Sequence, residues 1–365
     1  MRLGYSAGME FVMKAAIWYG RQDVRVGDVP DPSDPPPGQL QLEVAWCGIC
    51  GTDLHEYIAG PFYIPQGAPH PLTSVKAPVI IGHEMSGRVI AVGDAVQNFA
   101  VGDRVVVCPI IGCQRCRWCR SGSMAQCDKV AFLGTSWSGG ALSERLNVYA
   151  YQCFHLPDAI SDEVGALVEP FSATVRAVTT GQIGPDDNVA IVGAGPIGLM
   201  ALLAATLRGA KRVVAVEVAH RRKETAKKLG ATDVIDPAKE DPEKRALEIT
   251  EGEGFDVVVE CAGQPMTAQL AGKLTRTRGR LIVMGVFEKP APLDLTDLVF
   301  REKTVSGSMS GYGLYDDTIR MMTDPRFKGE ELITGRIPLE DLVGKGYHGL
   351  LYEKESNVKT LVSPH

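Results

Sequence analysis

The chain has 365 residues and a formal net charge of −6 at pH 7. This acidic balance argues against nucleic acid or an anionic membrane as the main partner. The apolar share of 45% and the charged share of 22% are those of an ordinary globular protein, and the length allows two domains. Six of the nine cysteines fall in two tight clusters with metal-ligand or redox spacing, which predicts a reducing, cytoplasmic location and argues against a secreted disulfide framework.

The N-terminal part of the chain is rich in short β-type runs. Residues 1–12 carry one arginine and no apolar stretch, so we expect a flexible N-terminal extension and no signal peptide. In residues 13–163, the runs AAIWY, LQLEVAW, GRVIAV and DRVVVCP are separated by Gly and Pro, and PDPSDPPPG reads as a loop. This pattern predicts an irregular, mainly antiparallel β domain.

Residues 164–304 have a different sequence pattern. The apolar runs NVAIV, RVVAVE, DVI, FDVVVE and GRLIVMG alternate with the helix-like segments IGLMALLAATLRG, RRKETAKKLG, EKRALEIT and MTAQLAGKL. Alternating strands and helices predict an α/β domain with a parallel sheet between helices. The uncharged stretch 189–207 resembles a membrane span in length, but its Gly and Pro residues favour a buried strand followed by a buried helix. Residues 305–365 are irregular again.

A glycine motif follows the first of these strands. VGAGPIGL gives Gly193-x-Gly195-x-x-Gly198 at the start of a helix. The first glycine permits a tight turn, the second lets a pyrophosphate approach the backbone, and the third lets helix and strand pack closely. The helix N-terminus offers N–H groups to the phosphates, so the motif predicts a dinucleotide site.

The choice between NAD and NADP depends on the end of the next strand. Glu217 stands there, 19 residues after Gly198, where its carboxylate can bind the ribose 2′-OH and repel a 2′-phosphate. The basic residues 221–223 are the alternative signal for NADP, but such residues often form a solvated helix face. We therefore predict NAD. The predicted cofactor contacts are Gly193, Gly195, Pro196, Ile197, Gly198, Glu217 and Arg222.

Four cysteines form a run with C-x2-C-x2-C-x7-C spacing. They are Cys113, Cys116, Cys119 and Cys127. Four thiolates close a tetrahedral zinc site without an open position, which is how a structural zinc is held. An iron–sulfur cluster also takes four cysteines, but no proline follows the fourth, and a hydride carrier makes a cluster unnecessary. The run predicts a structural-zinc lobe over residues 113–127.

A second donor set is scattered along the chain. The segment VAWCGICGTDLHEY contains Cys47 and Cys50, which could be a redox pair, half of a zinc site, or two cysteines with separate tasks. GHE supplies His83 and Glu84, and LVEP supplies Glu169. Together with Cys50 they offer sulfur, nitrogen and oxygen donors that zinc accepts while it keeps a position open for substrate.

The motifs CGICGTDLH, GHEMSG, VGDRVVV, the four-cysteine run, LVEP and VGAGPIGL together resemble the zinc-dependent medium-chain alcohol and polyol dehydrogenases, from Met13 to the C-terminus. The resemblance implies a GroES-like β domain (13–163), a Rossmann NAD-binding domain (164–304) and a C-terminal return to the first domain (305–365). It also implies two zinc ions per chain, NAD as the cofactor, and a homo-oligomer, either a dimer or a tetramer.

The resemblance also implies roles for the residues of the second donor set. The family's catalytic-zinc cysteine falls on Cys50, so Cys47 is expected to pack in the core. Thr52 falls on the hydroxyl that binds the alcohol oxygen, and His55 on the histidine that passes the proton toward solvent. Either Glu84 or Glu169 completes the metal's ligands. The predicted catalytic residues are Cys50, Thr52, His55, His83, Glu84 and Glu169, and the predicted ligands of the catalytic zinc are Cys50, His83, Glu84 and Glu169.

Two segments narrow the resemblance to one branch of the family. HEYIAGPFYIPQGAPHPLT, residues 55–73, and GYHGLLYEKESNVKTLVSP near the C-terminus resemble the (R,R)-2,3-butanediol dehydrogenases, the acetoin and diacetyl reductases. The expected reaction is NAD-linked oxidation of a small vicinal diol to its hydroxyketone. Sorbitol, threonine or other polyol dehydrogenases are the alternative within the family, and a non-catalytic zinc- and NAD-binding protein is the alternative of a different class.

Overall fold

The structure is a computed structural model that describes residues 12–353 and 356–365. The predicted extension, apart from its last residue, lies outside the described part. The chain forms two compact units. The first holds the chain up to Leu167 together with Gly335–Leu351 and Thr360–His365, and the second holds Val168–Thr334 and Tyr352–Lys359. The domain boundaries predicted at 163/164 and 304/305 stay predictions.

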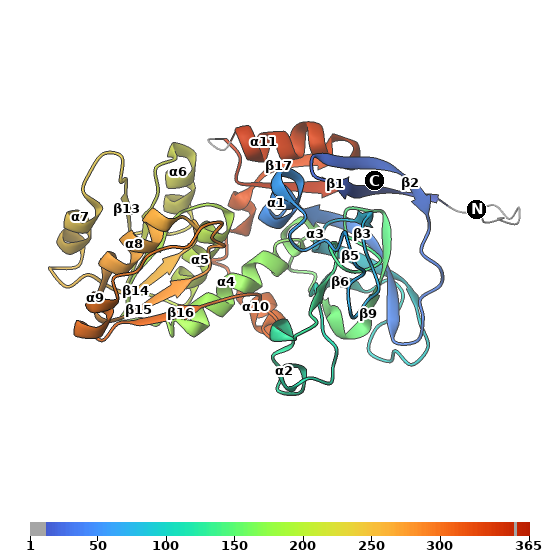
Figure 1. Cartoon of the computed structure of the whole chain (residues 1–365), viewed down its shortest axis with the longest axis horizontal. Coiled ribbons are helices and arrows are strands. Elements are labelled where there is room, and N and C mark those ends of the chain that lie inside the picture. The colour runs from blue at the N-terminus through green and yellow to red at the C-terminus, as the bar shows by residue number, and fades with distance from the viewer. Residues whose placement is uncertain (1–11, 354–355) are drawn as a thin grey trace, which may run out of the picture. The chain divides into compact units, whose positions relative to one another are not determined.

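The first unit is built from antiparallel β-sheets, as its Gly- and Pro-punctuated runs predicted. One sheet has the strand order β2-β1-β4, a larger one the order β10-β6-β5-β3-β18-β17 with β9 also paired to β3, and a small one joins β7 and β8 (Figure 1). The strands are β1 (Val12–Gly20), β2 (Asp23–Pro30), β3 (Gln39–Gly48), β4 (Val79–Ile80), β5 (Glu84–Val92), β6 (Arg104–Val107), β7 (Ile110–Ile111), β8 (Ala131–Phe132), β9 (Arg145–Tyr149), β10 (Cys153–His155), β17 (Ile333–Pro338) and β18 (Lys359–Ser363).

Short helices connect these strands, and one core lies beneath them. The helices are α1 (Gly51–Ala59), α2 (Arg117–Arg120), α3 (Asp162–Gly165) and α11 (His348–Tyr352). Buried apolar side chains, among them Trp18, Leu40, Leu42, Met85 and Leu146, form the core. Cys47 belongs to it and is 0% exposed, which confirms that this cysteine packs inside. In Figure 1 the segment that carries α2 extends as a green loop away from the strands of its unit.

The second unit contains the predicted parallel sheet. Its strand order is β13-β12-β11-β14-β15-β16, and every neighbouring pair runs parallel. With the strands renumbered from the first, this order is 3-2-1-4-5-6, the doubly wound Rossmann arrangement. The strands are β11 (Asn188–Val192), β12 (Arg212–Val216), β13 (Asp233–Ile235), β14 (Phe255–Glu260), β15 (Thr275–Val283) and β16 (Thr304–Gly307).

Helices alternate with these strands along the chain. They are α4 (Val168–Thr180), α5 (Pro196–Leu207), α6 (His220–Lys228), α7 (Pro242–Ile249), α8 (Pro265–Leu274), α9 (Leu295–Phe300) and α10 (Tyr315–Met322). The uncharged stretch 189–207 is the buried strand β11 followed by the buried helix α5, as predicted. No helix within the described residues combines the length and the apolar character that a membrane crossing requires.

Candidate functional site

The N-terminus of α1 presents the first group of predicted site residues. Cys50 is the N-cap of this helix, with extended backbone angles (φ −92°, ψ 155°). The buried carboxylate of Asp53 accepts a hydrogen bond from the Cys50 backbone N–H at 2.9 Å, which fixes the turn into the helix. The Cys50 thiol lies 3.7 Å from the Thr52 hydroxyl. The two groups for which the family resemblance implied contacts to metal and substrate are therefore neighbours.

Strand pairing brings the GHE motif to the same place. Glu84, the first residue of β5, pairs with Gly48 at the end of β3, two residues before Cys50. One donor atom from each of Cys50, His83 and Glu84 lies within 4.8 Å of the other two. His83 is 9% exposed and Glu84 is 1% exposed. A thiolate, an imidazole nitrogen and a carboxylate oxygen are ligands that zinc accepts, so this partly buried donor set fits the metal.

Two other predicted residues lie on helices. His55 is exposed on α1, three residues after Thr52, so the two side chains share a helix face. Glu169 lies in the first turn of α4, in the second unit, and its backbone carbonyl accepts a hydrogen bond from the Ser172 hydroxyl at 2.6 Å. Its part in the metal site stays a prediction.

The four-cysteine run folds into one cluster. The Sγ atoms of Cys113, Cys116, Cys119 and Cys127 all lie within 4.8 Å of one another. Backbone N–H groups point at the sulfurs: that of Cys116 lies 3.4 Å from Cys113 Sγ, and that of Cys119 lies 3.5 Å from Cys116 Sγ. Four thiols at this separation can surround a tetrahedral zinc, so the cluster fits the predicted structural metal.

The sulfurs of this cluster differ in acidity. Hydrogen bonds from the backbone N–H groups of Arg115 and Cys116 lower the pKa of the Cys113 thiol to about 6. Burial, and then the neighbouring Cys116 thiol, raise the pKa of Cys119 to about 12. A bound cation deprotonates a coordinating thiol outright. A metal in this cluster would therefore stabilise the thiolate of Cys119, which burial and the neighbouring thiol disfavour.

The glycine motif adopts the predicted turn between β11 and α5. Gly193 has φ +89°, a conformation that favours glycine, and its N–H donates to the Val216 carbonyl at 3.0 Å. A Cβ on Gly198 would overlap the Gly193 carbonyl, so strand and helix approach as closely as the motif predicts. Gly195 caps α5 and Pro196 is its first residue, which leaves the N–H groups of Ile197 and Gly198 in the first helical turn.

Glu217 is tied to this turn through its carboxylate. The side chain is 7% exposed, and its oxygens accept hydrogen bonds from the backbone N–H groups of Ala194 at 2.9 Å, Val218 at 2.8 Å and Ala219 at 2.9 Å. The Arg222 guanidinium lies 3.8 Å from the carboxylate. Lys223, the last residue of the basic run, forms an ion pair with Asp236. Much of the basic character that suggested NADP is thus neutralised within the unit.

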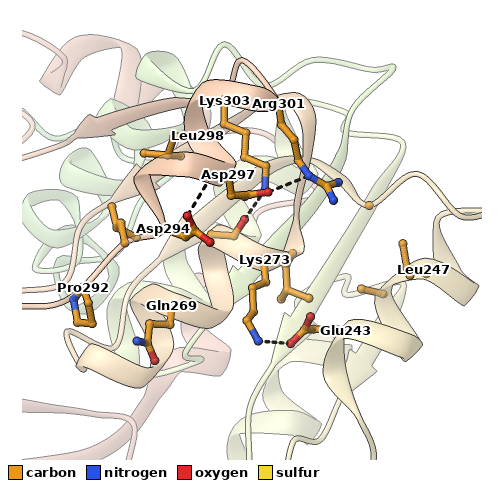
Figure 2. A pocket seen from close by; sticks show the side chains of 15 residues that line it. Glu243, Leu247, Gln269, Lys273, Pro292, Asp294, Asp297, Leu298, Arg301 and Lys303 are labelled. Carbon is orange, nitrogen blue, oxygen red and sulfur yellow. Dashed lines mark hydrogen bonds and ion pairs between the residues drawn. The ribbon is translucent and has the colours of Figure 1, made fainter.

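A cavity of about 720 Å³ in the second unit contains none of the predicted site residues (Figure 2). The three cations that line it are all paired: Lys273 Nζ lies 2.7 Å from a Glu243 carboxylate oxygen, while Arg301 and Lys303 both pair with Asp297. A wall whose cations are already neutralised has no evident charge for recognising an anion. We do not assign the reaction to this cavity.

Sequence reasoning missed two buried acids on α1. Asp53 and Glu56 are 3% and 1% exposed, and both carboxylates accept backbone N–H groups. The spacing of Asp53, three residues after the N-cap, is a capping signal that would have identified it. In the segment after α1, Ile64 packs in the core and is 2% exposed, whereas Phe62 and Tyr63 are exposed.

Two family models match the chain. The alcohol dehydrogenase GroES-like domain matches residues 36–158, and the zinc-binding dehydrogenase model matches residues 196–324. The (R,R)-butanediol dehydrogenase of Bacillus subtilis (strain 168) is 38% identical over 353 residues, which cover 97% of this chain and 100% of that protein. The chain therefore belongs to the zinc-binding alcohol dehydrogenase family and is an oxidoreductase, with zinc and a nicotinamide cofactor implied by that family.

Individual relatives show which branch the chain is similar to. A crystal structure of 2R,3R-butanediol dehydrogenase from Bacillus subtilis superposes with a TM-score of 0.91 at 39% identity, and the match covers 97% of this chain and 100% of that one. The likeness confirms the predicted combination of a GroES-like domain and a Rossmann domain. Sorbitol dehydrogenase from Bacillus subtilis (strain 168) is 32% identical, over 97% of this chain and 98% of that protein. The chain is thus a zinc-dependent alcohol or polyol dehydrogenase.

Proposed function

We propose that this chain oxidises a small vicinal diol with NAD, and that its substrate is (R,R)-2,3-butanediol, which becomes acetoin. The observation that carries the proposal is the donor set of Cys50, His83 and Glu84 beside the Thr52 hydroxyl. The likeness to butanediol dehydrogenases over nearly the whole chain supports the choice of substrate. Assembly as a homo-oligomer stays a prediction.

Two residues of α1 could transfer the hydroxyl proton of the substrate to solvent. Oxidation of a secondary alcohol sends a hydride from carbon to the nicotinamide and releases the hydroxyl proton. Zinc, held by Cys50, His83 and either Glu84 or Glu169, would lower the pKa of that hydroxyl. The partly buried Thr52 would hydrogen-bond the substrate oxygen, and the exposed His55 on the same helix face would pass the proton to solvent.

The nucleotide turn would hold the cofactor. The Ile197 and Gly198 N–H groups at the start of α5 would bind the pyrophosphate, and Glu217 would bind the adenosine ribose and disfavour a 2′-phosphate. The remaining predicted contacts are Gly193, Gly195, Pro196 and Arg222. We propose NAD over NADP because the charge of Arg222 is already opposed by Glu217, 3.8 Å away.

The test is a comparison of kcat/KM with NAD for (R,R)-2,3-butanediol, 2-butanol and sorbitol. 2-Butanol lacks the second hydroxyl, which would fix the carbon that faces the nicotinamide. We expect butanediol to exceed both others by at least about tenfold, or ~1.4 kcal/mol of transition-state binding. Faster oxidation of sorbitol would overturn the choice of a small diol. Absence of turnover with all three compounds would overturn the proposed function.

A further inference from the structure

Glu56 is a buried acid on α1 that the proposed chemistry does not use. Its residue is 1% exposed, although an ionised carboxylate loses its hydration when it is buried. Hydrogen bonds from protein donors must replace that hydration. The donors come from the segment that immediately follows the helix.

Three successive backbone N–H groups converge on this carboxylate. That of Phe62 lies 3.0 Å from Oε1 and 3.1 Å from Oε2, that of Ile64 lies 3.3 Å from Oε1, and that of Tyr63 donates to Oε1 as well. Consecutive N–H groups that point inward form a concave anion site, here occupied by the protein's own carboxylate. Residues 62–64 are thereby fastened to the last turns of α1.

The backbone of Glu56 is held as well. Its carbonyl accepts hydrogen bonds from the Trp18 indole N–H at 3.1 Å and from the Gly60 N–H at 3.2 Å. A Cβ on Gly60 would collide with the carboxylate and the carbonyl of Glu56, so the chain turns back tightly against the helix. The carboxylate is thus held in a fixed place, and it can fix the segment in turn.

This fastening determines which side chains of the segment face outward. Ile64 points into the core at 2% exposure, whereas Phe62 and Tyr63 are 57% and 45% exposed. The Tyr63 ring packs edge-on against Phe132, with 6.5 Å between ring centroids. Two large aromatic side chains in succession are therefore kept at the surface, one of them ordered by a ring contact.

The proton-handling residues lie on the same helix. Glu56 follows Thr52 by four positions, so these two side chains lie on the same face of α1. Four residues correspond to about 6 Å along a helix axis. The segment fastened by Glu56 therefore lies close along the helix to the residue that would bind the substrate oxygen.

We propose that Glu56 is a positioning residue for substrate selection, which holds Phe62 and Tyr63 as an apolar wall against the methyl groups of the diol. This inference rests on the proposed diol oxidation. Without the carboxylate, three N–H groups lose their shared acceptor and the aromatic pair loses its fixed place. Selection between diols with and without methyl groups should then weaken.

The test compares (R,R)-2,3-butanediol with ethylene glycol, a vicinal diol without methyl groups. In Glu56→Ala we expect kcat/KM for butanediol to fall at least about tenfold relative to that for ethylene glycol, with zinc content and the KM for NAD unchanged. Phe62→Ala should shift the ratio in the same direction. Ile64→Val is the matched control, since it alters the same segment on its core side and should leave the ratio as in wild type.

Hydrogen exchange at the backbone N–H groups of residues 62–64 provides a readout that is independent of substrate. We expect it to accelerate in Glu56→Ala. If that variant does not fold, Glu56→Gln keeps one acceptor oxygen and should show a smaller shift of both readouts in the same direction. An unchanged diol ratio in a folded Glu56 variant overturns the proposal, as does unchanged exchange. A wild-type enzyme that fails to oxidise butanediol overturns the proposed function, and the inference fails with it.

Discussion

Replacing Glu217 by serine tests the proposed NAD preference at one residue. The carboxylate sits at the end of β12 and is 7% exposed, so its charge is only weakly screened by solvent. It accepts three backbone N–H groups, including that of Ala194 in the glycine turn. Since a carboxylate has about four acceptor positions, it can also accept a ribose hydroxyl while it holds the turn.

The size of the effect follows from two contributions. A hydrogen bond to a charged group contributes about 1.5–3 kcal/mol, so loss of the ribose contact should lower kcat/KM for NAD by at least about tenfold. The Glu217 carboxylate would repel the 2′-phosphate of NADP, and two charges about 4 Å apart interact by about 4 kcal/mol at an effective dielectric constant of about 20. Relief of half of this repulsion should raise kcat/KM for NADP about 30-fold. Arg222, 3.8 Å from the carboxylate, would then face the 2′-phosphate unopposed by Glu217. We expect the NADP-to-NAD ratio of kcat/KM to rise at least about 100-fold.

The assay measures kcat/KM for both cofactors at saturating diol, with thermal unfolding as the check on folding. Glu217→Gln keeps an acceptor oxygen but removes the charge, so it should raise the ratio while disturbing the turn less. Glu260→Gln is the matched control, because Glu260 is a buried carboxylate at the end of β14 that also accepts backbone N–H groups. It should leave the ratio unchanged.

Two results would refute this reasoning about Glu217. One is a wild-type enzyme whose kcat/KM for NADP equals or exceeds that for NAD. The other is a folded Glu217→Ser variant whose cofactor ratio stays within about threefold of wild type. Either result would show that the preference between NAD and NADP does not depend on the Glu217 carboxylate.

Three further predictions concern the cysteine cluster and the proton path. Cys116→Ser should lower the thermal unfolding temperature while folded protein keeps some turnover, and unchanged stability would contradict a structural metal. In zinc-stripped protein, alkylation of Cys113 should slow as the pH falls through about 6, because backbone N–H groups lower the pKa of its thiol and the reactive thiolate is protonated below that value. An alkylation rate whose pH midpoint lies near the ordinary thiol pKa would contradict this. His55→Ala should keep zinc and NAD binding and slow alcohol oxidation by roughly 10–100-fold, with partial rescue by small amine buffers, whereas loss of zinc would show that His55 is a ligand.

The repeating pattern of the Rossmann unit made its fold predictable. Each apolar run of strand length became a strand of the parallel sheet, and each intervening segment became a helix. Glycine spacing also predicted backbone geometry, since Gly193 takes a positive φ and Gly198 tolerates no Cβ. These features are local, so the sequence carries them directly.

The grouping of Cys50 with His83 was predictable for a different reason. Cys50 and His83 are 33 positions apart, and no local pattern connects them. Motif resemblance linked them, and the pairing of β5 with β3 explains physically why they meet. Strand pairing within the first unit gives no such explanation for Glu169, which belongs to the second unit, and its ligand role stays a prediction.

The buried acids of α1 show where sequence reasoning ended. In the sequence, Glu56 is one more charged residue on a short helix, and its partners are backbone N–H groups, which every residue except proline possesses. Only the path of the chain after Gly60 turns those groups toward the carboxylate. The burial of Ile64 depends on the same turn.

Zinc held by Cys50, His83 and either Glu84 or Glu169 should be required for diol oxidation. The most direct measurement is the initial rate of NADH formation from (R,R)-2,3-butanediol by Cys50→Ser protein, with zinc counted on the same sample. We expect a folded protein with one zinc ion per chain, at the four-cysteine cluster, and no measurable oxidation, against two zinc ions and full activity in wild type. A Cys50→Ser protein that oxidises the diol at the wild-type rate, or a fully active wild type with a single zinc ion, would contradict the claim.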